Sequence, residues 1–335
     1  MAGKLIISLD FELFWGVRDK KSLEEYGINI LGVWDVIPTM IKLFERYNVK
    51  ATFATVGFLF AVSKEDLIKL TPKRYPHYLD SNLSPYNGHF ALISEFNSKL
   101  HFAPELIALI KKYPTHEIAT HTFSHYYCLE PGQNKEEFEQ DIMAAVETAK
   151  RDNIDIKSLV FPRNQFNDEY LEVIKSLGIT SFRGNERSWI YEAVNGGDEK
   201  LLRRALRLLD AYFNISGHNC YALGDLYRKE PFDIPSSRFL RPYSSRLRFL
   251  ERLRLRRILN SMTHAAKEGK LFHLWWHPHN FGINQNQNFR FLNKILDKYI
   301  ELNQKYGFES VTMKEMSSIL YKMRGNEKLS GVDFD

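Results

Sequence analysis

The sequence predicts an α/β fold in which helices cover both faces of a mainly parallel sheet. Short apolar segments of strand length alternate with amphipathic helical segments along most of the chain, and this alternation is typical of βαβ units. Several of the strand segments are apolar on both faces, as in a sheet that is buried on both sides. The periodicity does not distinguish an open sheet from a closed barrel. In both cases reactive residues should follow directly after strands, because ligands bind at the carboxyl ends of parallel strands.

The predicted elements follow one another in a regular order. Residues 4–10 form the first strand, an apolar run that is closed by an acid. Residues 33–47 carry apolar side chains at helical spacing, and residues 50–57 are strand-like again. The same reasoning predicts further strands at 116–120, 157–161, 178–183, 270–277 and 308–311, and helices at 103–113, 135–151, 167–177, 288–305 and from Thr312 onward. Gly178 fits the end of the helix before it, since glycine readily adopts the conformation that ends many helices.

Two stretches interrupt this order. Residues 58–102 carry scattered proline, asparagine, serine and aromatic residues, and they are expected to form an insertion or a lid. Residues 184–267 contain an arginine-rich segment and are expected to form several helices. We therefore predict one catalytic domain over residues 1–323, with insertions near 58–102 and 184–267, followed by a polar C-terminal tail at 324–335.

Composition and charge exclude several classes of protein. With 44% hydrophobic and 26% charged residues, the chain is globular rather than disordered. Only Cys128 and Cys220 occur, without CxxC spacing, so neither a disulfide framework nor a thiolate zinc site is indicated. No secretory signal and no apolar run of membrane-spanning length is visible, so we expect a cytoplasmic protein without a transmembrane segment. The net charge of +5 is small and no nucleic-acid-binding motif accompanies it, so binding of nucleic acid is not expected.

The basic residues are concentrated in one segment. Residues 238–257 contain eight arginines against a single acid, Glu251. Apolar residues are interleaved with them as far as Leu259, which fits a basic amphipathic helix on an anionic membrane. Through 238–259 the cytoplasmic protein would then lie at the inner face of the membrane. The favoured alternative is a helix whose apolar side packs on the protein while its arginines face water.

Two segments near the N-terminus carry acids and histidines directly after predicted strands. Asp10 and Glu12 end the first strand, and their carboxylates share one site because alternate residues of a strand lie on the same side. There one carboxylate can bind a metal while the other acts as a base, and ordinary loop acids are the alternative. His121 and His125 follow the strand at 116–120. Their spacing lets two imidazoles converge on one ion, at about 2.0–2.1 Å if the ion is zinc.

Two further segments follow later strands. Arg163 lies in FPRNQFN, and it could orient a carboxylate or bind an anionic substrate, although simple pairing with an acid explains it equally well. In LWWHPHNFG, His277 stands at the end of a strand and His279 follows two residues later. Trp275 and Trp276 could form an apolar wall or a surface on which a sugar stacks, or they could fill the core.

The four segments in this order, D-x-E, H-x3-H, FPR and L-x-x-H, resemble the motifs of the polysaccharide deacetylases of carbohydrate esterase family 4, which share the NodB-type homology domain. The resemblance covers most of the chain and implies a distorted (β/α)7-type barrel with parallel strands. It implies that His121 and His125 of HTFSH are metal ligands, with Glu12 as the third. It further implies that Asp10 is the catalytic base and that His277 of LWWH is the general acid.

The chain departs from the family pattern at three places. The usual adjacent pair of aspartates is replaced by Asp10 and Glu12, so that the metal-binding carboxylate stands one residue later and is one methylene longer. In the third motif Arg163 follows the proline instead of preceding it, and no tyrosine comes next. The Asp-Trp motif of the family is absent, and the stretch from Arg183 to Trp189 stands in its place.

The resemblance implies metal-dependent hydrolysis of an N-acyl group, acetyl or formyl, from an amino sugar. Two imidazoles and a carboxylate suit Zn²⁺ best, and Co²⁺, Ni²⁺ and Fe²⁺ are compatible. Arg163, Trp275, Trp276 and His279 are expected to bind the substrate, with His279 as the second candidate for the general acid. A cytoplasmic location points to a sugar or sugar-lipid precursor of surface polysaccharide or glycolipid. The alternatives are a small-molecule amidase of the allantoinase-like type and a non-catalytic carbohydrate-binding protein on the same fold.

Overall fold

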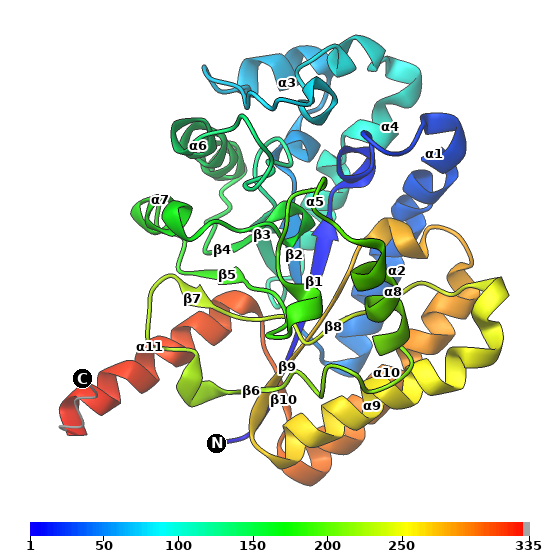
Figure 1. Ribbon diagram of the computed structural model, residues 1–335, viewed down its shortest axis with the longest axis vertical. Helices are drawn as coiled ribbons and strands as arrows, with labels where there is room; N and C mark the ends of the chain where they lie inside the picture. The colour runs from blue at the N-terminus through cyan, green and yellow to red at the C-terminus, as the bar shows by residue number, and fades with distance from the viewer. Residues whose placement is uncertain (331–335) are drawn as a thin grey trace.

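The computed structural model describes residues 1–330 of the 335-residue chain, which form a mainly parallel sheet that curls into a barrel surrounded by helices (Figure 1). The strands are β1 (Lys4–Phe11), β2 (Thr52–Thr55), β3 (Glu117–Thr120), β4 (Ser158–Val160), β5 (Ser181–Arg183), β6 (Tyr221–Ala222), β7 (Phe232–Asp233), β8 (Arg238–Phe239), β9 (Lys270–Trp276) and β10 (Glu309–Ser310). Neighbouring strands follow the order β6, β9, β1, β2, β3, β4, β5, β7, while β10 pairs with β1 and β8 with β9. Only β6 is antiparallel to its neighbour among these described strands. The predicted α/β barrel class is confirmed.

One extended segment brings the two ends of the curled sheet together. Residues 232–240 begin as β7 beside β5 and continue as β8 beside β9. Ile234 N donates to Phe182 O (2.9 Å) on one side, and Leu240 N donates to Trp275 O (2.8 Å) on the other. The segment therefore takes the place of one strand between β5 and β9. Together with β1–β5 and β9 it completes the seven strand positions of a (β/α)7-type barrel.

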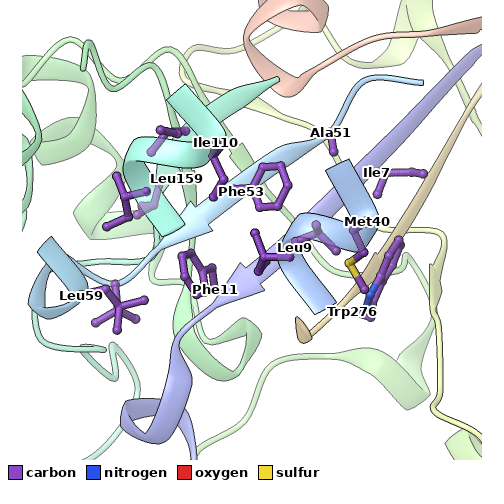
Figure 2. Packing of buried hydrophobic residues seen from close by; sticks show 14 of the residues in the cluster. Ile7, Leu9, Phe11, Met40, Ala51, Phe53, Leu59, Ile110, Leu159 and Trp276 are labelled. Carbon is purple, nitrogen blue, oxygen red and sulfur yellow. The ribbon is translucent and has the colours of Figure 1, made fainter. Parts of the chain in front are cut away.

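Strand β1 separates two hydrophobic cores, because its residues alternate between the barrel interior and the helices outside. Ile7, Leu9 and Phe11 belong to the larger core between the sheet and the helices (Figure 2). Ile6 belongs to the second core, which collects residues from strands all around the barrel: Ala54, Ala119, Val160, Phe232 and Leu271. Every residue of β1 is buried, which explains why this strand is apolar on both faces. Asp10 lies on the same side of β1 as Ile6, because alternate residues of a strand share one side. It therefore faces the barrel interior, at the carboxyl end of the strand.

Helices cover the outside of the barrel and one of its ends. They are α1 (Leu23–Leu31), α2 (Val33–Tyr47), α3 (Lys64–Leu70), α4 (Ser98–His101), α5 (Pro104–Lys111), α6 (Lys135–Arg151), α7 (Leu171–Ser176), α8 (Leu201–Asp210), α9 (Glu251–Lys267), α10 (Gln285–Tyr306) and α11 (Met313–Ser330). Helices α2, α10 and α9 pack side by side on one flank, and α6 and α7 lie on the other (Figure 1). Helix α11 begins at the amino ends of the strands, where Met313 N donates to Thr52 Oγ1 (3.0 Å). The opposite end of the barrel is left for the site.

The predicted elements are found close to their expected positions. Helix α6 begins and ends where predicted, because Asn134 caps it by accepting a hydrogen bond from Glu137 N (3.0 Å). The strand expected at 178–183 is shorter, since Gly178 has a φ of +80° and still belongs to the turn that ends α7. Helix α11 is longer than expected and includes the first part of the tail predicted at 324–335. Residues 331–335 of that tail lie outside the described residues.

The stretches that interrupt the strand–helix order are helical in part. Between β2 and α5 the chain forms α3, α4 and several short 3-10 helices, and α8 lies between β5 and β6. The division into one catalytic domain with insertions near 58–102 and 184–267 stays a prediction.

The arginine-rich segment is not one helix, and the prediction of a basic amphipathic helix over 238–259 is corrected here. It begins as β8 and passes through a 3-10 helix over Ser245–Leu250 before α9 starts. Arg238 and Arg257 are buried, and both are ion-paired with Asp210 at the end of α8. These arginines hold α8, β8 and α9 together and do not face a membrane.

By length and composition alone, the stretch Leu23–Tyr47 could cross a membrane, as the single candidate among residues 1–330. Half of its most apolar window of 18 residues is buried within the fold. It consists of α1 and α2, and α2 packs against α5 and α10 as a core helix does.

Candidate metal centre and active site

The predicted reactive residues gather at the carboxyl ends of the barrel strands. Asp10 and Glu12 come from the end of β1, His121 and His125 from the loop after β3, and His277 and His279 from the segment after β9. All of them are buried except His277, whose side chain is 24% exposed. Solvent and a substrate can therefore reach the site from the side of His277.

Glu12 lies at the centre of this group. Its Oε2 is 3.0 Å from Nε2 of His125 and 3.3 Å from Nε2 of His121. Ligand atoms of a tetrahedral ion bound at about 2.0–2.1 Å lie roughly 3.3–3.4 Å apart, so these three atoms have the spacing that a divalent cation needs. A carboxylate with two imidazoles is also a donor set that zinc and similar ions accept. The residues fit a metal ion, and Glu12, His121 and His125 would hold it.

Hydrogen bonds on the far side of each imidazole orient the ligand atoms. Nδ1 of His121 lies 2.8 Å from the backbone oxygen of Val160, to which it can only donate, so Nε2 keeps its lone pair. Nδ1 of His125 is hydrogen-bonded to the hydroxyl of Tyr127 at 3.2 Å. Burial lowers the pKa of His125 to about 4, so its ring is neutral at physiological pH. These are the conditions that a metal-binding histidine must meet.

The loop that carries these two histidines is held by a buried carboxylate of α6. Asp141 accepts hydrogen bonds from the backbone N–H groups of Phe123 (2.7 Å) and Ser124 (3.0 Å), and from the Ser124 hydroxyl. Thr122 and His125 have positive φ angles of 63° and 61°, which are unfavourable for residues with a side chain. Asp141 therefore stabilises a strained loop that brings both imidazoles to one point.

Glycine at position 16 leaves room for the Glu12 carboxylate. The chain turns back through the 3-10 helix Leu13–Gly16, and this turn brings Gly16 against the Glu12 side chain. A Cβ atom on Gly16 would lie 2.0 Å from both Cδ and Oε1 of Glu12. A residue with a side chain at this position would displace the carboxylate from the imidazoles.

Asp10 is held by Arg183 at the end of β5, and not by Arg163. The guanidinium donates to both carboxylate oxygens, at 2.6 Å to Oδ1 and 2.8 Å to Oδ2, and also to Ser8 Oγ (3.0 Å) and Asn164 Oδ1 (2.9 Å). Burial raises the pKa of Asp10, but the charge and hydrogen bonds of Arg183 and the nearby histidines outweigh it, so the pKa lies below its ordinary value. Asp10 is therefore a carboxylate at neutral pH, with a fixed orientation.

His277 and His279 stand on the other side of Glu12. Nε2 of His277 lies 3.7 Å from Asp10 Oδ2 and 3.6 Å from Glu12 Oε1. Nδ1 of His279 lies 3.7 Å from Glu12 Oε1, and burial lowers the pKa of this ring to about 3. Because His277 reaches both Asp10 and solvent, it is better placed than His279 to transfer a proton to a substrate.

Arg163 lines a cavity of about 230 Å³, to which none of the six reactive residues contributes and which adjoins them through Trp275, whose ring packs against that of His277. It is ion-paired with Asp19, and its guanidinium carbon lies 4.0 Å from the centre of the Tyr127 ring. The cavity is also lined by charged, amide and aromatic side chains, among them Asn164, Asn185, Glu186, Arg207, Arg241 and Phe239. This mixture suits a small polar ligand. The role of Arg163 in binding substrate stays a prediction.

The two tryptophans lie on opposite faces of β9, as alternation along a strand requires. Trp275 lines the cavity, and its ring centre is 4.1 Å from the guanidinium carbon of Arg183. Trp276 is fully buried in the outer core (Figure 2). Its ring packs against Phe44 and Phe281. The structure therefore does not bring Trp276 to the site, and its expected contact with substrate is corrected.

Four residues that build the site were not assigned a role from the sequence: Arg183, Asp141, Gly16 and Tyr127. Arg183 ends a predicted strand, so the rule that reactive residues follow strands could have found it. Asp141 lies among the apolar positions of a predicted helix, and an acid on a buried face is a usable signal. Gly16 and Tyr127 gave no signal, because their importance depends on contacts with distant or folded-back segments.

A carboxylate and two imidazoles at metal spacing, a second carboxylate beside them and an accessible histidine define a hydrolase-type site that can hold a divalent metal. Comparison with known proteins agrees with this class. The family model described as polysaccharide deacetylase matches residues 32–182, which include His121 and His125. The matched part of the chain, residues 32–182, is therefore similar to the polysaccharide deacetylases, a family of hydrolases that act on acetyl groups of carbohydrates. The resemblance read from the motifs is thus confirmed.

Solved structures support the same fold. A protein from Mycobacterium smegmatis named for the polysaccharide deacetylases has a TM-score of 0.57 at 13% identity, over 96% of this chain and 91% of that one. A protein from Pseudomonas aeruginosa named in the same way has a TM-score of 0.52 at 9% identity, over 94% of this chain and 89% of that one. No curated protein sequence matches the chain.

Proposed function

We propose that this protein hydrolyses the N-acyl group of an amino sugar with the help of a divalent cation held by Glu12, His121 and His125. The observation that carries the proposal is the position of Glu12 Oε2, which is 3.0 and 3.3 Å from the two imidazole nitrogens. Beside it, Arg183 fixes a second carboxylate, that of Asp10. Zn²⁺ suits this donor set best, and Co²⁺, Ni²⁺ and Fe²⁺ are alternatives.

The reaction follows from the positions of Asp10 and His277. A divalent cation bound here supplies Lewis acidity, which lowers the pKa of water and polarises the acyl carbonyl. Asp10 accepts a proton from the attacking water, whose oxygen forms the new bond to the acyl carbon. The bond between that carbon and the nitrogen then breaks. His277 donates a proton from Nε2 to the departing nitrogen, which is otherwise a poor leaving group, and the products are a carboxylic acid and a free amine.

The size of the cavity favours a small substrate. Its volume of about 230 Å³ is below the range of about 300–1,000 Å³ that is usual for ligand pockets, so it offers space for about one sugar ring. Arg163 and Trp275 at its border would supply a charged hydrogen-bond donor and an aromatic surface. We therefore infer that a single N-acylated sugar occupies this cavity, and the expected cytoplasmic location favours a sugar that is linked to a nucleotide or a lipid, as in a precursor of surface polysaccharide or glycolipid.

The decisive experiment measures acyl release together with metal content. The metal-loaded protein is incubated with N-acetylated and N-formylated sugars, both free and nucleotide-linked, and acetate or formate is quantified. Asp10→Asn and His277→Ala should abolish turnover while the metal stays bound, and His121→Ala should lose the metal. Full metal occupancy in His121→Ala would refute the site.

Matched controls and the two alternative functions use the same preparation. Asp35→Asn and His77→Ala change the same residue types at exposed positions and should keep both metal and activity. Release of ammonia or of a ring-opened product from ureides would instead indicate the allantoinase-like amidase. A metal content far below one ion per chain, with retained sugar binding, would indicate a carbohydrate-binding protein.

A contact with an anionic membrane would use arginines other than the buried ones. Arg246, Arg248, Arg252 and Arg256 are exposed, and Phe249 beside them is 73% exposed. Helix α8 adds exposed leucines at positions 201 and 202. We infer that these basic and apolar side chains provide the membrane contact, since cations and apolar groups together favour an anionic interface.

Co-sedimentation with vesicles tests this contact. Binding to anionic vesicles, but not to zwitterionic ones, should be lost in the double variant Arg246→Glu and Arg248→Glu. Lys73→Glu reverses the charge at an exposed position in the loop after α3, and this variant should bind as the unmodified protein does. Failure of the unmodified protein to bind anionic vesicles at low salt removes the membrane from the proposal.

A further inference from the structure

The two oxygens of the Glu12 carboxylate face two different pairs of histidines. Oε2 faces His121 and His125, at 3.3 and 3.0 Å. Oε1 faces His277 and His279, at 3.6 and 3.7 Å. Each oxygen and its own two nitrogens form a compact set whose atoms lie within 4.8 Å of one another. Two sets of three ligand atoms therefore meet at one shared carboxylate.

The second set has an unused ligand atom. Nδ1 of His279 is buried and has no hydrogen-bond partner within the described part of the chain, although it points toward Glu12 Oε1. A buried polar atom without a partner costs about 1–3 kcal/mol, so such atoms need an explanation. The ring of His279 stacks on that of His277, at 5.0 Å and with an angle of 16° between them, so the two histidines lie side by side next to Glu12. A bound cation would satisfy this nitrogen.

We propose that Glu12 bridges two divalent cations, the second of which is held by Glu12 Oε1, Nε2 of His277 and Nδ1 of His279. This inference rests on the proposed function, because the first of the two ions is the one that Glu12 holds together with His121 and His125. The two distances from Glu12 Oε1 to the nitrogens of the second set, 3.6 and 3.7 Å, are a few tenths of an ångström longer than a tetrahedral ion requires, so the second ion binds more weakly than the first.

Occupation of the second set has a consequence for the reaction. The Nε2 atom of His277 is the one that donates a proton to the leaving nitrogen, and a cation on the same atom removes that function. The second cation is therefore inhibitory, and the protein is active with one ion and inactive with two. The level of free metal would then control the enzyme through its own general acid.

The test is a titration of the metal-free full-length protein with Co²⁺, followed by equilibrium dialysis and by the visible absorption of the bound ion. The unmodified protein should bind one ion tightly and a second one weakly. His279→Gln, which keeps a polar side chain of similar size, should keep the first ion and weaken the second by more than the roughly 10–100-fold caused by loss of an outer partner of a ligand. His77→Ala should bind two ions, as the imidazole of His77 is exposed, pairs with Glu137 and belongs to neither set of ligands.

The outcomes separate this inference from the proposed function. One ion in the unmodified protein, lost in His121→Ala and unaffected by His279→Gln, overturns the bridge and leaves the proposed function standing. A single ion that depends on His279 and not on His121 overturns both. Activity gives a second readout, expressed for each protein as the ratio of activity in excess Co²⁺ to activity at one equivalent. Excess Co²⁺ should inhibit the unmodified protein, and it should inhibit His279→Gln much less. Equal inhibition of the two proteins would contradict the inhibitory role.

Discussion

Gly16→Ala is the sharpest single test of the metal centre, because it acts on Glu12 without changing any ligand. The new Cβ would stand 2.0 Å from Cδ and Oε1 of Glu12, while ordinary contacts begin at 3.4 Å. The carboxylate must therefore retreat by about 1.4 Å, since the end of a flexible side chain yields more easily than the backbone. Metal–ligand distances tolerate only about 0.2 Å, so Glu12 would no longer bind an ion together with His121 and His125.

The expected effect is a loss of metal affinity in a protein that still folds. Loss of a residue that hydrogen-bonds to a metal ligand typically weakens metal binding about 10–100-fold, or 1.4–2.7 kcal/mol. Displacement of Glu12, a ligand itself, should weaken metal binding at least as much. The free energy of unfolding without metal should change by less than about 1 kcal/mol, because Gly16 has a negative φ that alanine accepts. The stabilisation that saturating metal gives to the unmodified protein should fall by the amount of affinity lost.

Two measurements and one control decide this prediction. The dissociation constant for Zn²⁺ is measured by competition with a chelator, and thermal unfolding is recorded with and without Zn²⁺. Gly27→Ala is the matched control, because a Cβ at that helical glycine would meet no atom within 4 Å and should leave metal affinity unchanged. An unchanged dissociation constant in a well-folded Gly16→Ala protein would show that Glu12 is not a metal ligand.

Three further predictions concern the surroundings of the site. Replacing Arg183 by Met should lower the free energy of unfolding by about 3–5 kcal/mol, because Asp10 is left as an unpaired buried charge. The same substitution should move the acid limb of the kcat/KM profile to higher pH, because the pKa of Asp10 rises. In the unmodified protein the pKa of Asp10 is lower in the folded state than in the unfolded state. The stabilisation by the Asp10–Arg183 pair is therefore present above the unfolded-state pKa of about 3.9, and it is lost as the pH falls through the folded-state pKa. Denaturant unfolding from pH 7 to 3 should show this loss only when the arginine is present. Asp210→Ala should destabilise the protein by about 3–5 kcal/mol in the same assay, since it strands two buried arginines, and equal stability would show that the network is dispensable. Trp276→Ala should cost about 3–5 kcal/mol of stability, whereas Trp275→Ala should mainly raise KM, and a reversed pattern would contradict the assignment of their two faces.

The sequence allows most of the fold to be predicted because its strands and helices are marked by local patterns. Helix α6 has an asparagine cap, acids in its first turn and basic residues in its last turn, so both of its ends are visible in the sequence. The barrel strands are short apolar runs that end in reactive residues. Residues 232–240 could not be recognised as a strand, because they form two pieces of two residues each whose partners, β5 and β9, are far away in the sequence.

The candidate site is predictable where spacing along one strand or loop decides it, and not where distant elements meet. Asp10 with Glu12, and His121 with His125, are pairs whose geometry follows from local chain direction. Arg183 is different, because its contact with Asp10 joins β5 to β1 across the barrel interior and no local pattern encodes it. Arg238 of β8 and Arg257 of α9 are the same case, since their partner Asp210 lies at the end of α8.

The departure from the family pattern at Glu12 is physically connected with the turn that follows it. Glu12 stands beyond Phe11, the last residue of β1, so its carboxylate must turn back toward the histidines over a longer side chain. The turn that follows has a strained Leu13, with a φ of 47°, and it brings Gly16 to the one place where a Cβ would block the carboxylate. The Glu12 carboxylate occupies the space that a Cβ at position 16 would need, which is why a single methyl group there is expected to undo the site.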